Sequence, residues 1–137
     1  MVKNRPLLLM FAALGIYLLN VSLAQSTELK DMIELSVTGD AGQSFIGDCY
    51  LVSETGTEKR HRIKGQVPIK FWLPARAARC HMEKNSAKGK MITTITRNGL
   101  KEFIQRSRYP FRWVSISSAG PWGRAMGQVS AAYPAMR

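Results

Sequence analysis

Hydrophobic and polar residues alternate over many short segments of this chain, and residues 44–52 give the clearest example. One set of alternate positions in this segment holds Phe45, Gly47, Cys49 and Leu51. The intervening positions hold Ile46, Asp48, Tyr50 and Val52. A period of two over this length predicts a β-strand with one buried face.

Similar short segments follow one another along the chain, with Gly, Pro and other turn residues between them. They are residues 32–37, 59–64, 69–73, 77–83, 91–97, 100–106 and 111–117. Segment 100–106 also fits helical spacing, so a short helix there is an alternative. The spacing predicts an all-β protein, a small antiparallel β-sandwich or barrel of about seven or eight strands.

Asn98-Gly99 is the strongest hairpin signal, because both residues tolerate the positive φ of a type I′ turn. A two-residue loop would place Arg97 opposite Leu100 and Ile95 opposite Glu102. The hydrophobic positions would then share one face, namely Met91, Ile95, Leu100 and Ile104.

The N-terminus has the layout of a secretory signal peptide. Lys3 and Arg5 precede the apolar run 7–19, and small residues occupy alternate positions at 20–24. We therefore predict a signal peptide at 1–24 and export to the periplasm or the extracellular space. The alternative is an uncleaved membrane anchor with an external domain. The expected organisation after cleavage is a flexible start (25–31), a sandwich domain (32–117) and a Gly/Pro/Ala-rich, disordered or extended tail (118–137).

Cys49 and Cys80 are the only cysteines, and export favours a disulfide between them. Both fall on inward positions of predicted strands, so we expect them to bridge facing strands in the core. A metal site with His61 and His81 is the alternative, but the spacing matches no zinc pattern. We expect neither a metal nor another cofactor.

The stretch that carries Phe45-x-Gly47-x-Cys49, Gly65-Gln-Val-Pro68, Cys80 and Asn98-Gly99 resembles the small secreted immunoglobulin-like β-sandwiches of bacteria. The resemblance covers about residues 32–117 and concerns the architecture. It implies two packed antiparallel sheets. Ala78 stands where the immunoglobulin pattern has a Tyr, and Trp72 lies close to the second Cys. The resemblance therefore transfers no functional residue.

Charge is unevenly distributed in the sequence, whose net charge is +11. Residues 25–58 hold one Lys and seven acidic residues, whereas residues 59–137 hold 17 basic and two acidic residues. A basic surface on an exported protein attracts anionic lipids, acidic glycans or acidic proteins, and makes nucleic acid a less expected partner. Charge that only maintains solubility is the alternative.

The candidate anion-binding residues are Lys59, Arg60, Arg62, Lys64, Arg108 and Arg112. The first four form the densest cationic segment, which would equally suit a solvated edge strand that blocks edge-to-edge pairing. The leading hypothesis is a non-enzymatic β-sandwich that binds an anionic or acidic partner through these residues.

Aromatic residues alternate at Tyr109, Phe111 and Trp113, with Arg108 and Arg112 between them. We expect this stripe to face the core, because a small domain needs its aromatic side chains inside. Trp122, in a Gly-Pro-Trp-Gly context, either packs back on the sandwich or is a docking segment. A cell-envelope assembly subunit that docks through this tail is therefore an alternative function.

His61 and His81 are the only histidines. A secreted phosphodiester-cleaving enzyme would use one as base and the other as acid. No G-x-S-x-G, H-E-x-x-H, P-loop or Rossmann glycine pattern occurs. The sequence therefore favours a binding protein over this enzyme.

Overall fold

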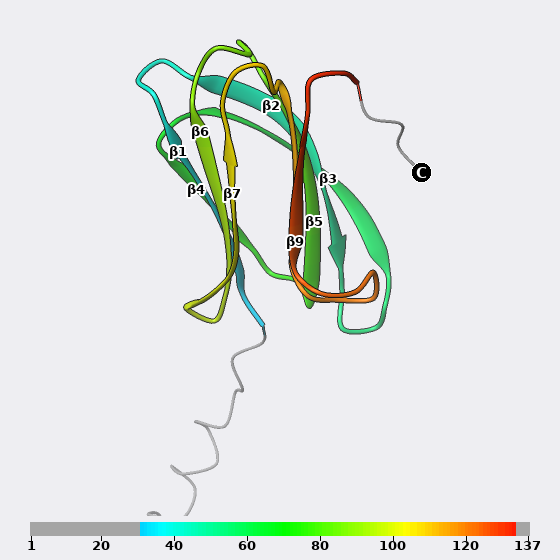
Figure 1. The fold of residues 1–137 in the computed structure, drawn as a ribbon. Coiled ribbons are helices and arrows are strands. Elements are labelled where there is room, and N and C mark those ends of the chain that lie inside the picture. Colours follow the sequence, from blue (N-terminus) through cyan, green and yellow to red (C-terminus); the bar gives the residue numbers. More distant parts are fainter. Residues whose placement is uncertain (1–30, 134–137) are drawn as a thin grey trace, which may run out of the picture.

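A computed structural model describes residues 31–133, which form two antiparallel β-sheets packed face to face (Figure 1). The strands are β1 (Ile33–Gly39), β2 (Ser44–Val52), β3 (Glu58–Gln66), β4 (Ile69–Leu73), β5 (Ala77–Lys84), β6 (Met91–Arg97), β7 (Leu100–Ser107), β8 (Trp113–Ser117) and β9 (Met126–Ser130). One sheet has the order β4-β1-β6-β7 and the other the order β3-β2-β5-β8-β9. The predicted small antiparallel β-sandwich is confirmed.

The core lies between the sheets and is built from the inward positions of the alternating segments. The four-stranded sheet contributes Ile33, Leu35, Val37, Leu73, Met91 and Ile95. The five-stranded sheet contributes Phe45, Cys49, Ile63, Cys80, Met82, Val114 and Ile116. All nine strands lie within 31–133, so a chain of residues 25–137 contains every contact of this core.

The sandwich extends beyond residue 117, where the domain was expected to end. Strand β9 pairs with β8, from Trp113 opposite Ser130 to Ser117 opposite Met126. Gly127 lies so close to Phe103 that an added Cβ would stand 2.6 Å from the Phe103 ring, so β9 packs against β7 of the other sheet. The segment 118–133 therefore belongs to the domain and supplies a ninth strand that its Gly and Ser content concealed.

Cys49 and Cys80 form the predicted disulfide, and both are fully buried. They are directly opposed residues of the neighbouring strands β2 and β5, with their Cα atoms 4.0 Å apart. The bridge thus lies within one sheet and does not join facing strands across the core. Immunoglobulin domains place theirs between the sheets, and they keep the first two strands in one sheet. The chain therefore differs from the immunoglobulin pattern in both respects, and what is shown is a two-sheet β-sandwich.

The Asn98-Gly99 turn connects β6 and β7 as predicted, with φ of 49° and 83° at its two residues. Arg97 faces Leu100, but a β-bulge follows, so Ile95 pairs with Phe103 and not with Glu102. The bulge places Phe103 opposite Ile95, where it packs against the core, and Ile104 opposite Thr94. The prediction that Ile104 shares the face of Ile95 is therefore wrong. Leu100 keeps its predicted partner Arg97 at the end of the hairpin, where it is 75% exposed.

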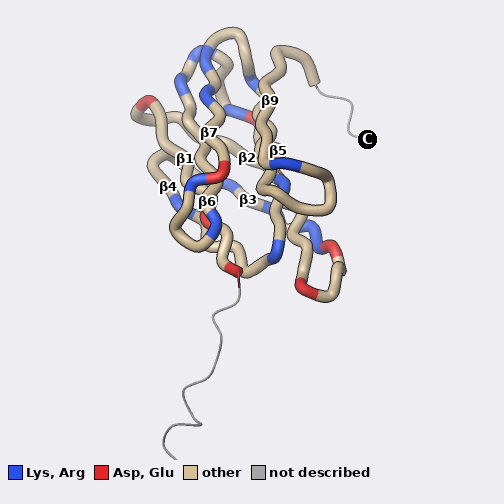
Figure 2. Tube along the Cα trace, turned by 60° about the horizontal axis from the view of Figure 1, so that its bottom comes forward, with Lys and Arg blue, Asp and Glu red and all other residues tan. Residues whose placement is uncertain are grey.

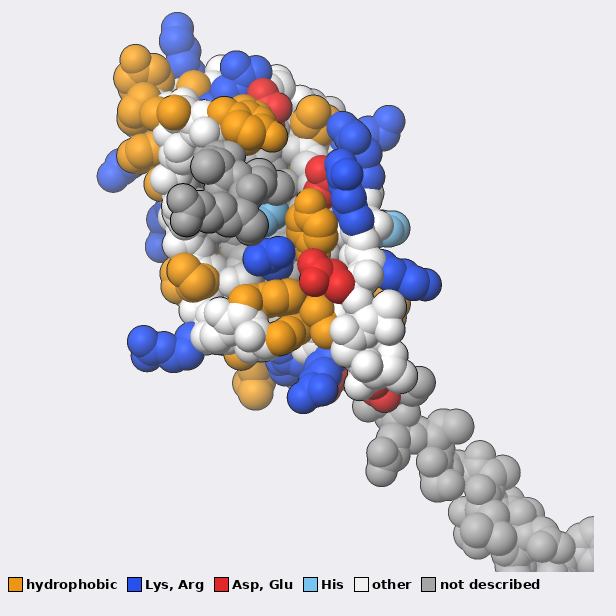
Figure 3. All heavy atoms as spheres, turned by 90° about the vertical axis from the view of Figure 1, so that its right-hand side faces the viewer, with side chains coloured by type: hydrophobic (Ala, Val, Ile, Leu, Met, Phe, Trp, Pro, Cys, Tyr) orange, Lys and Arg blue, Asp and Glu red, His pale blue; other side chains and the backbone are white. Residues whose placement is uncertain are grey.

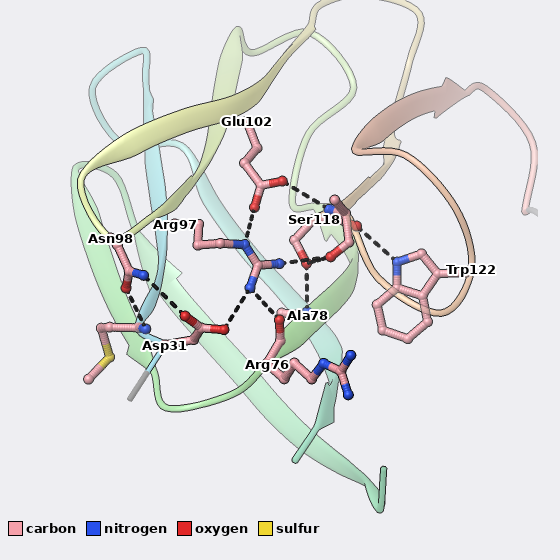
Figure 4. A network of polar contacts seen from close by, with 10 residues as sticks. Asp31, Arg76, Ala78, Arg97, Asn98, Glu102, Ser118 and Trp122 are labelled. Atoms are coloured by element: carbon pink, nitrogen blue, oxygen red, sulfur yellow. Dashed lines mark hydrogen bonds and ion pairs between the residues drawn. The ribbon is translucent and has the colours of Figure 1, made fainter. Parts of the chain in front are cut away.

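The bulge also directs Glu102 towards Arg97, and these two side chains organise one end of the sandwich (Figure 4). Arg97 Nε donates to Glu102 Oε1 over 2.7 Å, and Arg97 Nη2 donates to the Ala119 carbonyl over 2.7 Å. Glu102 Oε2 accepts a bond from the Ala119 N–H, while Arg97 Nη1 reaches Asp31 and the Arg76 carbonyl. The network joins the β6–β7 hairpin to the β8–β9 loop.

The predicted signal peptide (1–24) and most of the predicted flexible start (25–31) lie outside the described residues. Within 31–133, no helix is long and apolar enough to cross a membrane. The disulfide is compatible with an oxidising, exported location.

Candidate functional site

A row of polar side chains crosses the outer face of the five-stranded sheet. Register places Arg62 beside Asp48, Asp48 beside His81, His81 beside Ser115 and Ser115 beside Gln128. Directly paired residues of antiparallel strands lie on the same face. Figure 3 shows this side of the molecule, where charged and hydrophobic side chains are interspersed.

Part of this row lines a shallow hollow of about 210 Å³. The side chains that give it chemical character are Asp48, Arg60, Arg62, Glu83, Trp113 and Tyr133. Trp113 and Tyr133 meet edge to face, with ring centroids 4.7 Å apart. The hollow therefore combines an aromatic wall with charges of both signs.

The charges in the hollow are only partly paired. Asp48 Oδ2 accepts from Arg60 Nη2 over 3.1 Å, whereas the buried Asp48 Oδ1 has no hydrogen-bond partner among the described residues. Glu83 forms an ion pair with Arg112 over 3.0 Å. Arg62 is exposed, and none of the ion pairs of the described chain involves it. Arg62 is thus available to a ligand as a donor, and Asp48 Oδ1 is a buried acceptor without a partner next to it.

His81 lies in the middle of the row and is half-buried. Its Nδ1 is 3.0 Å from Ser115 Oγ, and its ring contacts the edge of Tyr50, with centroids 6.0 Å apart. Burial lowers the pKa of the imidazole below its ordinary value of 6.5, and the positive charge of Arg79 lowers the pKa further, whereas Asp48 opposes this shift. His81 is therefore predominantly neutral at pH 7.

This shift predicts a pH-dependent stability. Below about pH 6.5 the unfolded chain takes up a proton at His81 that the folded protein resists, so the free energy of unfolding falls as the pH drops from that value through the folded pKa. We expect His81→Gln to lose this part of the pH dependence, measured by urea unfolding between pH 7.5 and 5. His61→Gln is the matched control. If both variants keep the wild-type slope, protonation of His81 does not limit stability.

The His81–Ser115 pair does not form a covalent-catalytic site by itself. Strands β5 and β8 both lie inside the sheet, so their backbone N–H groups around the pair are engaged in the ladder. Stabilisation of an oxyanion needs preorganised donors at that position. Among the described residues the row is therefore better suited to binding a ligand than to acyl transfer.

Trp122 packs back on the sandwich, on the same outer face of the five-stranded sheet. Its indole N–H donates to the Ser118 carbonyl over 3.0 Å. The Arg79 guanidinium lies between two rings, 5.1 Å from the centroid of Trp122 and 5.4 Å from that of Tyr50. Trp122 is thus held against the sandwich.

The six candidate anion-binding residues do not form one patch. Arg60, Arg62 and Lys64 share the outer face of edge strand β3, but Lys59 pairs with Leu51 and lies on the opposite face. Arg112 does not line the hollow but forms an ion pair with Glu83, which does. Arg108 lies in the β7–β8 turn, after the end of β7, and does not line the hollow. Only Arg60 and Arg62 line the hollow.

The aromatic stripe is also divided, and the expectation that it faces the core is wrong. Strand β8 begins at Trp113, and its buried positions are Val114 and Ile116. Trp113 therefore faces outwards and lines the hollow, while Tyr109 is 67% exposed. Phe111 is half-buried.

The two histidines lie on opposite faces of the five-stranded sheet. His61 pairs with Cys49, whereas His81 pairs with Asp48, the residue before Cys49 in the same strand. Successive residues of a strand point to opposite faces. A reaction that needs both imidazoles on one phosphate is incompatible with this arrangement. The cysteines are joined to each other and are not metal ligands.

The uneven distribution of charge along the sequence largely disappears in the fold. The acidic residues of the first part pair with basic residues of the second, as in Asp48–Arg60, Glu34–Lys70, Glu58–Arg79 and Asp31–Arg97. This happens because β1 and β2 are inner strands with basic neighbours on both sides. What remains is a set of unpaired cations at particular places on the surface.

Comparisons with known protein families, characterised proteins and solved structures find no match for this chain. Conclusions about function therefore rest on the geometry of the molecule. The sequence had indicated Arg60 and Arg62 but not Asp48 or Tyr133. The alternation of β2 already placed Asp48 opposite the core face, but only the strand order brings Asp48 to Trp113.

Proposed function

We propose that this protein is a non-enzymatic binding protein for an acidic glycan, which it holds on the outer face of the five-stranded sheet. The observation that carries the proposal is the hollow that joins the Trp113–Tyr133 pair to the unpaired Arg62 and the unsatisfied oxygen of Asp48. Each of these groups matches one part of such a ligand.

The aromatic rings offer an apolar surface for the face of a sugar ring. The Arg62 guanidinium is suited to a carboxylate or sulfate, which it binds with two parallel hydrogen bonds. A rotation of the Asp48 carboxylate would bring Oδ1 to the surface of the hollow. There it would accept a bond from a sugar hydroxyl and would no longer be buried without a partner. A purely anionic ligand would leave the carboxylates of Asp48 and Glu83 as repulsive neighbours, so the mixed charges favour a hydroxyl-rich acid.

The size of the hollow favours a segment of a polymer. Sites that enclose a drug-sized molecule have volumes of roughly 300 to 1,000 Å³, whereas this hollow has about 210 Å³ and is open to solvent. We infer that one sugar unit occupies it while the rest of the glycan lies along the sheet. Export, which the disulfide supports, would bring the protein to such polymers.

The test is a titration of the 25–137 chain with a polyuronate and with its carboxyl-reduced, neutral counterpart, followed by calorimetry and tryptophan fluorescence. We expect binding of the polyuronate alone. Arg62→Gln should weaken it about tenfold, which corresponds to the loss of one charge-assisted interaction of about 1.4 kcal/mol.

Lys59→Gln is the matched control, because it removes the same charge from the same strand on the opposite face. Tyr133→Ala, at an exposed position, should weaken binding to a similar degree by removing part of the aromatic wall. Equal effects of Arg62→Gln and Lys59→Gln, or equal affinity for the neutral polymer, would exclude this site as an acidic-glycan site.

A further inference from the structure

A second cationic surface lies at one end of the sandwich, apart from the hollow. The β5–β6 turn and the β7–β8 turn are neighbours there, because Met91 pairs with Ser107 and Ile92 with Arg106. The Lys84 N–H also bonds to the Arg112 carbonyl between the bases of the two turns. We call the exposed side chains of this end the basic end, which consists of Lys88, Lys90, Arg106, Arg108 and Tyr109.

The four cations of the basic end are exposed, and none of them belongs to an ion pair of the described residues. The register of β6 and β7, continued by one residue, places Lys90 beside Arg108. Asp40 is near Lys90, but its carboxylate accepts a bond from the Lys90 backbone N–H. Figure 2 shows Lys and Arg positions gathered at the upper end of the molecule.

Tyr109 adds an aromatic ring to this charge. It lies between Arg108 and Pro110 at the β7–β8 turn and is 67% exposed, one of the most exposed large side chains of the described domain. Figure 3 shows hydrophobic side chains at the upper end with Lys and Arg side chains around them. The basic end therefore presents a ring amid cations, and carboxylates do not surround it as they do in the hollow.

This combination fits the surface of an anionic bilayer. Tyr is favoured at membrane interfaces, where its ring sits among the headgroups. Lys and Arg close to an anionic surface each raise the membrane partitioning of a protein about fivefold at low screening. A glycan site would instead need acceptors for hydroxyl groups, and this end offers few. We propose that the basic end docks the protein end-on to membranes that contain anionic lipids.

Docking through this end leaves the outer face of the five-stranded sheet accessible, because the turns lie at the ends of the strands and the hollow lies on their face. The two surfaces are therefore independent. A protein held end-on would present its sheet face to polymers that lie next to the membrane. The inference does not depend on the proposed glycan site, and different residues carry it.

The test uses the 25–137 chain, which contains all nine strands, and phosphatidylcholine vesicles with and without about 30% phosphatidylglycerol, a fraction that gives the bilayer a negative surface potential. Cosedimentation is measured at several salt concentrations. We expect the wild-type chain to bind only the anionic vesicles, and binding should decrease as salt screens the surface. The triple variant Lys88→Gln/Lys90→Gln/Arg108→Gln should bind at least tenfold more weakly.

The matched control is Lys59→Gln/Lys101→Gln/Arg124→Gln, which removes the same charge from exposed positions elsewhere. It should reduce vesicle binding less than threefold. Tyr109→Ser should weaken binding severalfold, whereas Trp72→Ser, at an exposed position of edge strand β4 outside the basic end, should not. Equal losses for the two triple variants, or binding to neutral vesicles, would overturn the proposal.

Failure of this proposal is distinguishable from failure of the glycan proposal. The basic-end triple variant should keep its affinity for the polyuronate, and Arg62→Gln should keep its affinity for anionic vesicles. If the basic-end variant loses affinity for the soluble polyuronate to the same extent as for vesicles, the basic end is a general polyanion surface and the assignment to lipid is wrong.

Discussion

Replacing both Cys49 and Cys80 by valine is expected to lower the free energy of unfolding by about 3 to 4 kcal/mol. The two cysteines are separated by 31 positions in the sequence. In the chain-entropy model, closing a loop of this length lowers the conformational entropy of the unfolded chain and so stabilises the folded state by about 3 to 4 kcal/mol. The loop contains β3 and β4, which are edge strands of different sheets. The cross-link therefore restricts, in the unfolded chain, the segment that supplies one edge strand to each sheet. Valine suits a buried pair of opposed strand positions, so most of the loss should come from the missing bond.

The measurement is urea unfolding with and without a reductant. At a slope of about 2 kcal/mol per M, the midpoint of the variant should fall by about 2 M. Reductant should lower the midpoint of the wild-type chain towards that of the variant and leave the variant unchanged, which makes the wild type its own control. If the midpoint of the variant is close to that of the oxidised wild type, the disulfide contributes little to the free energy of unfolding and the prediction is wrong.

The strands themselves could be predicted because their physical cause is local. Residues 44–52 alternate cleanly, and the segment is strand β2 over the same bounds. The Asn98-Gly99 turn depends on two adjacent residues and was also predicted correctly. Strand β9 was not predicted, because Met126–Ser130 has little hydrophobic alternation of its own and is ordered by pairing with β8.

The candidate site could be predicted only in part, because it depends on strand order and on single-residue register. One extra residue in a strand exchanges its two faces. The bulge near Glu102 is such a case, since it moves Phe103 to the core and Ile104 to the surface. Trp113 was misplaced for a different reason. Both sets of alternate positions in this segment hold apolar residues, and the set that faces the core is Val114 and Ile116, so Trp113 faces outwards.

The surface charge also depends on strand order and could not be predicted from the sequence. A sequence divided into an acidic and a basic part suggests a divided surface, but the acidic strands β1 and β2 are central and pair with basic neighbours. The surface charge of the folded protein is set by which cations are left without partners. Arg62 and the basic end were left in this way, at places that only the topology determines.

The second large effect is expected for Arg97→Met, which should lower the free energy of unfolding by about 2 to 3 kcal/mol, the range for hydrogen bonds of charged groups that leave a partner unsatisfied. Arg97 bonds to Glu102, to the Ala119 carbonyl and to Asp31, and only about a quarter of its side chain is exposed. Methionine keeps the hydrophobic stem but leaves the Glu102 carboxylate without its cation.

Lys101→Met is the matched control, because Lys101 lies beside Glu102 on the same hairpin but is exposed. It should change stability by less than about 0.5 kcal/mol, as is usual for surface substitutions. The loss at Arg97 should also reach the β8–β9 loop, because Ala119 precedes the segment that carries Trp122 (Figure 4). Hydrogen exchange of the Trp122 indole N–H, measured by NMR, should therefore accelerate in Arg97→Met and not in Lys101→Met. If stability falls but the exchange rate of the indole N–H is unchanged, Arg97 stabilises the fold but does not position the Trp122 loop.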